Sequence, residues 1–167
     1  YYRKHANILA AAFGLQNRSG TRKLVNKIFK DPLIKDLPVQ PYFDHYLFEA
    51  IHKADLDKKY AFKLLKVFTN NIKIKDKGLP EGFYKPDESY VFDYSHAWAC
   101  TPYYSFIVAT LGLNIIEPGL KKIEVKPIKT KLDFSYVIPT VYGDILINKK
   151  NDKFDIKKPE CIEIMEK

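Results

Sequence analysis

The chain has 167 residues, 46% of them hydrophobic and 14% aromatic, and a formal net charge of +8. This length and composition supply a core for one domain or for two small ones. No apolar run approaches the roughly 18 residues of a membrane span, so no membrane partner is expected. Only Arg3, Arg18 and Arg22 are arginines, and the lysines are scattered among apolar residues, so no nucleic-acid partner is expected.

The N-terminal segment predicts a hairpin of two helices. Apolar residues stand at helical spacing in residues 1–13, and Gly14 supplies a stop. Ser19 or Thr21 can cap a second helix, which ends before Pro32.

A second helical hairpin is predicted after a link that contains prolines. Residues 41–53 place aromatic and aliphatic side chains on one side of a third helix, and Asp57 caps a fourth. Two successive hairpins, each with one broad apolar face, favour the stacked hairpins of a toroid or solenoid over an isolated four-helix bundle.

Residues 78–104, GLPEGFYKPDESYVFDYSHAWACTPYY, contain a predicted loop that is too long for a simple connection. The loop gathers carboxylates, aromatic rings and one histidine, which are the side chains that hold a sugar ring by hydrogen bonds and stacking. The alternative is a surface loop whose aromatic residues pack beneath it. Thr101 and Pro102 then begin a fifth helix, which ends at Gly112.

The C-terminal third predicts strands instead of helices. After Glu117-Pro118-Gly119, polar and apolar residues alternate, with turn residues around Gly143 and Asn151. About five short strands are available, so the expected fold class is α+β, with a small antiparallel β-sandwich or a sheet packed on the helices.

Three motifs occur in a characteristic order: Ser95-His96-Ala97-Trp98, then LGL with EPGLKK in residues 111–122, then PTVYGDI in residues 139–145. Together they resemble the end of bacterial α-L-rhamnosidases of glycoside hydrolase family 78. Upstream, HANILAAAFGL and PYFDHYLFEAI look like the family's preceding barrel helices. The resemblance covers essentially the whole chain and is most specific in residues 95–147.

The resemblance implies a division into two parts. Residues 1–113 would be the last helices of an (α/α)6 barrel, carrying the active-site loop 78–104, and residues 114–167 would be a C-terminal β-sandwich domain. A partial ring leaves its apolar flanks open. The missing N-terminal barrel segment is therefore an expected partner, in cis or as a second chain.

The family resembles other inverting glycosidases, in which an acid protonates the leaving oxygen and a carboxylate activates water, the two roughly 6.5 to 9.5 Å apart. The family's base matches Glu81, although Pro80 stands where the family usually has tryptophan. Glu88 is the next candidate, and Asp93 is a more distant one. The family's acid comes from a stretch before the region present here, so this chain alone is expected to be inactive.

The resemblance also implies sugar contacts. His96 matches the family's sugar-contacting histidine, Trp98 offers an apolar plane, and Tyr94, with Tyr84 and Tyr90, would line the wall. The alternatives are a histidine bonded to nearby backbone at a helix start, and a tryptophan that belongs to the core.

No cofactor is expected. No metal site is expected either, because His45 and His52 share a helix without a third ligand. The implied function is that of the C-terminal portion of an inverting α-L-rhamnosidase, which hydrolyses terminal α-L-rhamnose from glycans or glycosides. The expected partner is a rhamnose-containing carbohydrate. The alternative is a non-catalytic carbohydrate-binding or degenerate chain of the same fold.

Overall fold

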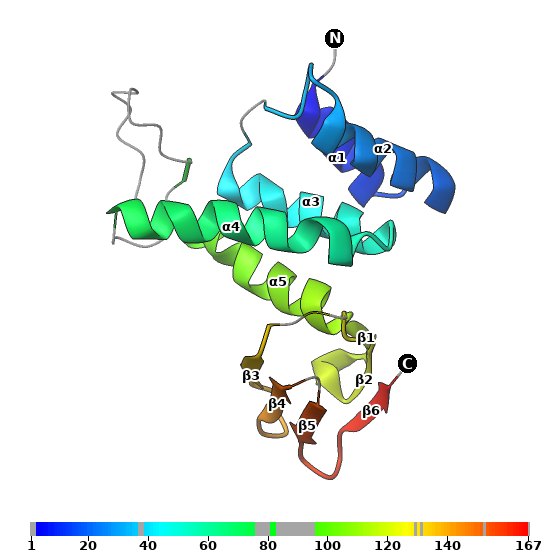
Figure 1. Ribbon diagram of the computed structural model, residues 1–167. Coiled ribbons are helices and arrows are strands. Elements are labelled where there is room, and N and C mark those ends of the chain that lie inside the picture. The colour runs from blue at the N-terminus through cyan, green and yellow to red at the C-terminus, as the bar shows by residue number, and fades with distance from the viewer. Residues whose placement is uncertain are drawn as a thin grey trace. The chain divides into compact units, whose positions relative to one another are not determined.

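The computed structural model describes residues 3–36, 39–75, 81–82, 96–128, 130, 132–151 and 153–166, and for residues 68–75 it describes the backbone alone. The chain forms two compact units, Tyr1–Phe106 and Ile107–Lys167. Figure 1 shows the helices that build the first unit and the strands that build the second. The division falls within one helix, which supplies residues to both units.

The helices of the described residues are α1 (Lys4–Ala12), α2 (Arg18–Lys30), α3 (Pro41–Lys53), α4 (Asp57–Lys75), the 3-10 helix η1 (Ala97–Cys100) and α5 (Thr101–Leu111). The two predicted hairpins are present, since α1 packs against α2 and α3 packs against α4. Helix α3 also packs against α1, α2 and η1, which makes it the central helix of the first unit.

The first hairpin turns at Gly14, where a φ of +67° places the backbone in the left-handed region that glycine adopts readily. The prediction that Ser19 or Thr21 caps α2 is wrong. The helix begins earlier, and Asn17 Oδ1 accepts a 2.9 Å hydrogen bond from Gly20 N. Asparagine is among the strongest N-cap residues because its side chain accepts this bond.

The core of the first unit combines the apolar faces of α1 to α4. Its largest fully buried side chains come from all four helices and from the link before α3: Ile8, Ile28, Ile34, Leu47, Phe48, Ile51 and Tyr60. The stacked rings of Phe29 and Tyr60, 4.0 Å apart, join α2 to α4. These contacts fix α3 between its neighbours, so the N-terminal turn of α3 is held in place.

The strands of the second unit are β1 (Asn114–Glu117), β2 (Lys122–Val125), β3 (Phe134–Ile138), β4 (Ile145–Lys150), β5 (Lys153–Lys157) and β6 (Glu163–Glu166). They form two three-stranded sheets, with strand orders β1-β2-β6 and β3-β4-β5. The second sheet is antiparallel throughout, with Tyr136 opposite Ile147 and Ile147 opposite Ile156.

Two features of these sheets differ from the predicted antiparallel sandwich of about five strands. The described residues form six strands, and β2 pairs with β6 in parallel. Strand β1 has no period-two pattern, because all four of its residues are exposed. The parallel pair arises because the chain completes the whole β3-β4-β5 sheet before it returns beside β2, and parallel strands require such a long connection.

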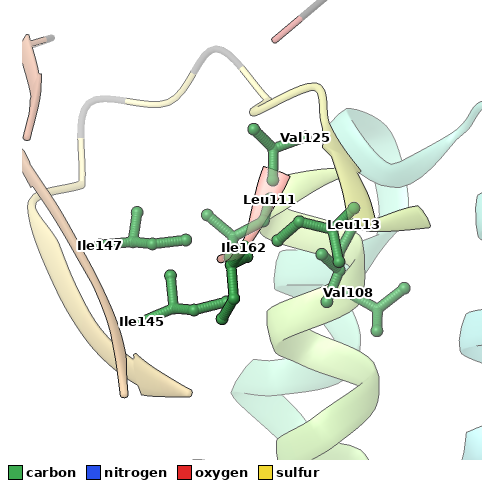
Figure 2. Close-up of a cluster of buried hydrophobic side chains, with 8 residues drawn as sticks. Val108, Leu111, Leu113, Val125, Ile145, Ile147 and Ile162 are labelled. Atoms are coloured by element: carbon green, nitrogen blue, oxygen red, sulfur yellow. The ribbon is translucent and has the colours of Figure 1, made fainter. Parts of the chain in front are cut away.

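Both sheets contribute to one core with the C-terminal turns of α5, as Figure 2 shows. The cluster consists of Val108, Leu111, Leu113, Ile123, Val125, Ile145, Ile147 and Ile162. Half of these residues, Ile123 with Val125 on β2 and Ile145 with Ile147 on β4, are β-branched and occupy alternate strand positions, which is the pattern of a half-buried sheet. Gly112, with a φ of +56°, ends α5 as predicted and lets the chain turn from the helix into β1.

Candidate functional site

The 3-10 helix η1 presents Trp98 at the surface of the first unit. Ala99 is fully buried and packs η1 into that unit, whereas 65% of the Trp98 side chain is exposed. Two hydrogen bonds fix the turn: Ala99 N donates to His96 O at 2.9 Å, and Thr101 Oγ1 donates to Trp98 O at 3.1 Å. The alternative that Trp98 belongs to the core is therefore wrong.

Tyr42, in the first turn of α3, supports the indole of Trp98. The two ring centroids are 5.3 Å apart, and the planes are inclined by 43°. The hydroxyls of Tyr42 and Tyr46 lie 3.5 Å apart, and this hydrogen bond raises the pKa of Tyr42 above its ordinary value. The imidazole of His96 meets the indole edge to face at 6.5 Å.

Two further ring contacts join α3 to α1 and its C-terminal end. The ring centroids of Phe43 and His5 lie 4.4 Å apart, and those of Tyr46 and Phe13 lie 5.8 Å apart. We call this set of rings the aromatic cluster; it consists of His5, Phe13, Tyr42, Phe43, Tyr46, His96 and Trp98. Exposed aromatic faces of this kind bind apolar or C–H-bearing faces of ligands, and the polar tips of tyrosine and histidine supply hydrogen bonds.

The cluster lies where two helices begin, because Tyr42 follows Pro41 at the start of α3 and Trp98 precedes α5. The arrangement is chemically suited to hold a ring compound, because the exposed indole plane lies beside the ring of Tyr42 and the imidazole of His96.

The structure brings together His96 and Trp98 of the predicted site. Glu81 is exposed and belongs to the short described segment 81–82, so its role as a base stays a prediction. The predicted wall residue Tyr94 and the alternative base Glu88 lie outside the described residues. The candidates Tyr84, Tyr90 and Asp93 also lie outside the described residues.

Sequence reasoning missed Tyr42 and Tyr46 as site residues, since it assigned them only to the packing side of the third helix. The available signal is their spacing of four residues at the very start of a helix, which puts both on the same face. The contact of Tyr42 with Trp98 joins segments far apart in the chain, so the sequence pattern alone gives no indication of it.

The two histidines of α3 have separate partners. His45 Nδ1 lies 2.9 Å from Ser105 Oγ, which links α3 to α5, and His52 Nδ1 lies 3.3 Å from Asp57 Oδ1. The hydrogen bond to Asp57 raises the pKa of His52. Among the residues that the structure describes, no group of three or more histidine, cysteine or acidic side chains is placed to hold a metal ion.

No helix in the described part of the chain has the length and hydropathy that crossing a membrane requires.

The fold resembles part of a larger glycoside hydrolase. The crystal structure of a GH78 family rhamnosidase of Bacillus sp. GL1 matches 99% of this chain with a TM-score of 0.81 and 17% sequence identity. The chain spans 19% of the length of that protein. No protein-family model and no curated protein sequence matches the chain. The match establishes a distant fold relationship between this chain and one segment of the rhamnosidase.

Proposed function

We propose that this chain is the C-terminal portion of an inverting α-L-rhamnosidase, which removes terminal α-L-rhamnose from glycans or glycosides. The observation that carries the proposal is the exposed Trp98 beside His96 and Tyr42, within a fold similar to that of a rhamnosidase. The motif Ser95-His96-Ala97-Trp98 that resembles the family is thus also the segment that presents an aromatic plane.

The proposed roles divide between sugar contacts and proton transfer. Trp98 packs against the apolar, methyl-bearing face of the rhamnose ring, and His96 and Tyr94 hydrogen-bond its hydroxyls. Glu81 is the general base that takes a proton from the attacking water. In an inverting reaction this water attacks from the face opposite to the leaving group, so the product has the opposite anomeric configuration.

The general acid lies outside this chain in the proposal. Residues 1–113 supply the last helices of an (α/α)6 barrel, and the remaining helices and the acid come from another segment, in cis or as a second chain. Support comes from the small share of the GH78 rhamnosidase that this chain spans. Without the acid, the leaving alkoxide loses general-acid assistance of roughly 100-fold to 10,000-fold, so the 167-residue chain alone is inactive.

The test is release of the chromophore from an aryl α-L-rhamnoside by the full-length protein that contains this chain. We expect turnover, a loss in kcat of about 100-fold or more in Glu81→Gln, and no loss in the matched control Glu160→Gln, because Glu160 is an exposed loop residue of the second unit. Full activity of Glu81→Gln would refute the role of Glu81. Rhamnose binding without turnover by the full-length protein would favour the non-catalytic carbohydrate-binding alternative.

A further inference from the structure

A cavity of about 360 Å³ lies among α1, α2, α3, α4 and the link before α3. Its volume is at the lower end of the range of small-molecule pockets, roughly 300 to 1,000 Å³. Part of the wall is apolar, with Phe29, Leu47 and Leu64 among its residues. None of the residues of the aromatic cluster lines it.

The polar centre of this cavity is the carboxyl group of Asp44 on α3. Asp44 is 2% exposed, and its Oδ1 has no hydrogen-bond partner among the residues that the structure describes. A buried oxygen without a partner is destabilising, so an unpaired group of this kind calls for an explanation. Because Asp44 lines the cavity, a ligand there can supply the missing donor.

The ionisable groups around Asp44 are mainly basic. Lys4, Lys35 and Lys63 line the cavity, against the carboxyl groups of Asp36 and Asp44. Lys4 Nζ donates to Lys35 O at 2.9 Å, and Lys35 Nζ lies 3.7 Å from Asp36 Oδ2. Three ammonium groups against two carboxyl groups leave an excess of positive charge, which attracts an anion into a partly apolar, concave site.

We propose that this cavity binds a small hydroxylated carboxylate, with a ligand hydroxyl donating to Asp44 Oδ1 and the ligand carboxylate facing the lysines. A hydroxyl satisfies the buried acceptor, and the carboxylate offsets the excess positive charge. The carbon chain of the ligand packs on the apolar wall. The proposal is independent of the rhamnosidase proposal, because it concerns different residues and a different ligand.

The experiment is isothermal titration calorimetry on the full-length protein that contains this chain, with D-gluconate as the probe. Sorbitol carries comparable hydroxyls without the charge, and hexanoate carries the charge without the hydroxyls. We expect gluconate to bind at least tenfold more tightly than either. Absence of gluconate binding, or equal binding of sorbitol or hexanoate, would overturn the proposal.

Two variants locate the binding. Asp44→Leu removes the acceptor and replaces a buried unpaired carboxyl with an apolar group, and we expect a loss of gluconate affinity of about tenfold. Lys63→Met removes an exposed ammonium group at the cavity and should weaken binding severalfold, whereas Lys58→Met on the same helix should leave it unchanged. If Asp44→Leu does not fold, Lys63→Met decides: affinity equal to that of Lys58→Met contradicts the assignment.

Discussion

The indole of Trp98 lies 5.3 Å from the ring of Tyr42, which joins η1 to the first turn of α3. Tyr42 therefore supports the indole, while 65% of the Trp98 side chain stays exposed. The other end of α3 is tied to α2, because Arg22 Nη1 donates to Ala54 O at 3.0 Å. The support for Trp98 thus belongs to a helix that is fixed at both ends.

This support predicts that ligand binding depends on Tyr42 as well as on Trp98. Trp98→Ala removes the plane itself, and Tyr42→Ala removes the ring that orients it, so each should weaken L-rhamnose binding by the full-length protein. An aromatic contact is worth roughly 0.5 to 1.5 kcal/mol, which corresponds to about twofold to tenfold in affinity. Titration calorimetry measures the change.

Tyr42→Phe and Tyr103→Ala are the controls for this series. The first keeps the supporting ring and removes only its hydroxyl, so it should lose less affinity than Tyr42→Ala. The second removes an exposed tyrosine of α5 and should bind rhamnose as the unmodified protein does. Affinity unchanged in Trp98→Ala would show that the exposed indole is not a sugar contact.

The burial of Asp44 predicts a stability that falls with rising pH. Burial raises the pKa of Asp44 from its ordinary value of 3.8 to about 7, with a smaller opposing effect of Lys4. Between these pH values the folded chain keeps a proton that the unfolded chain has lost, so the free energy of unfolding decreases as pH rises from about 4 to about 7. The total effect is on the order of 4 kcal/mol.

Urea denaturation at a series of pH values measures how the free energy of unfolding changes with pH. Asp44→Asn removes the titrating group, so the variant should show a flatter pH profile and greater stability than the unmodified chain at pH 8. Asp155→Asn, at an exposed position on β5, is the matched control and should leave the profile unchanged. An identical profile in Asp44→Asn would be incompatible with the raised pKa.

The His52–Asp57 pair predicts a second pH dependence at the turn between α3 and α4. The hydrogen bond to Asp57 raises the pKa of His52 above 6.5, whereas burial lowers the pKa of His5 below 6.5. The stabilisation from protonated His52 is therefore complete below pH 6.5 and is lost as pH rises through its folded-state pKa.

Proton NMR titration of the histidine rings measures both pKa values. We expect His52 to titrate above pH 6.5 and His5 below it. Asp57→Asn should lower the pKa of His52 and leave that of His5 where it is. The reverse order of the two histidines, or a His52 pKa indifferent to Asp57→Asn, would contradict the contact.

The backbone at Gly112, in the second unit, should not tolerate a side chain. Its φ is +56°, and an added Cβ would lie 2.3 Å from Lys126 O. Gly112→Ala should therefore lower the free energy of unfolding by roughly 1 to 2 kcal/mol because of the left-handed backbone, and by a further 1 to 3 kcal/mol because of the clash. Gly14 has a similar φ of +67°, but an added Cβ there would have no atom within 4 Å. Gly14→Ala should therefore lose only the stability that the left-handed backbone costs. Urea denaturation that gave equal losses for the two variants would rule out the clash.

Local sequence signals predicted much of the fold. The bounds of α3, residues 41–53, follow from a proline at the first position and the apolar spacing behind it. The turn before β4 was also predicted, and Thr140 Oγ1 closes it by donating to Gly143 O at 2.6 Å. These features depend on residues close together in the chain, so the sequence pattern is sufficient to find them.

Long-range contacts were not predictable in the same way. The parallel pairing of β2 with β6 joins residues about 40 positions apart, since Lys122 lies opposite Glu163. Asp44 stands among polar and aromatic residues of an amphipathic helix, and nothing in that pattern marks it as 2% exposed. The support of Trp98 by Tyr42 likewise exists only after α3 and η1 have packed together.

The anomer of rhamnose that is released first distinguishes the proposed inverting mechanism from a retaining one. Proton NMR can follow hydrolysis of an aryl α-L-rhamnoside by the full-length protein that contains this chain, and it identifies the first anomer released before mutarotation. An inverting α-L-rhamnosidase with Glu81 as base must release β-L-rhamnose first, and Glu81→Gln must suppress that signal. Release of α-L-rhamnose first, or no hydrolysis by the full-length protein, would refute the proposed inverting α-L-rhamnosidase.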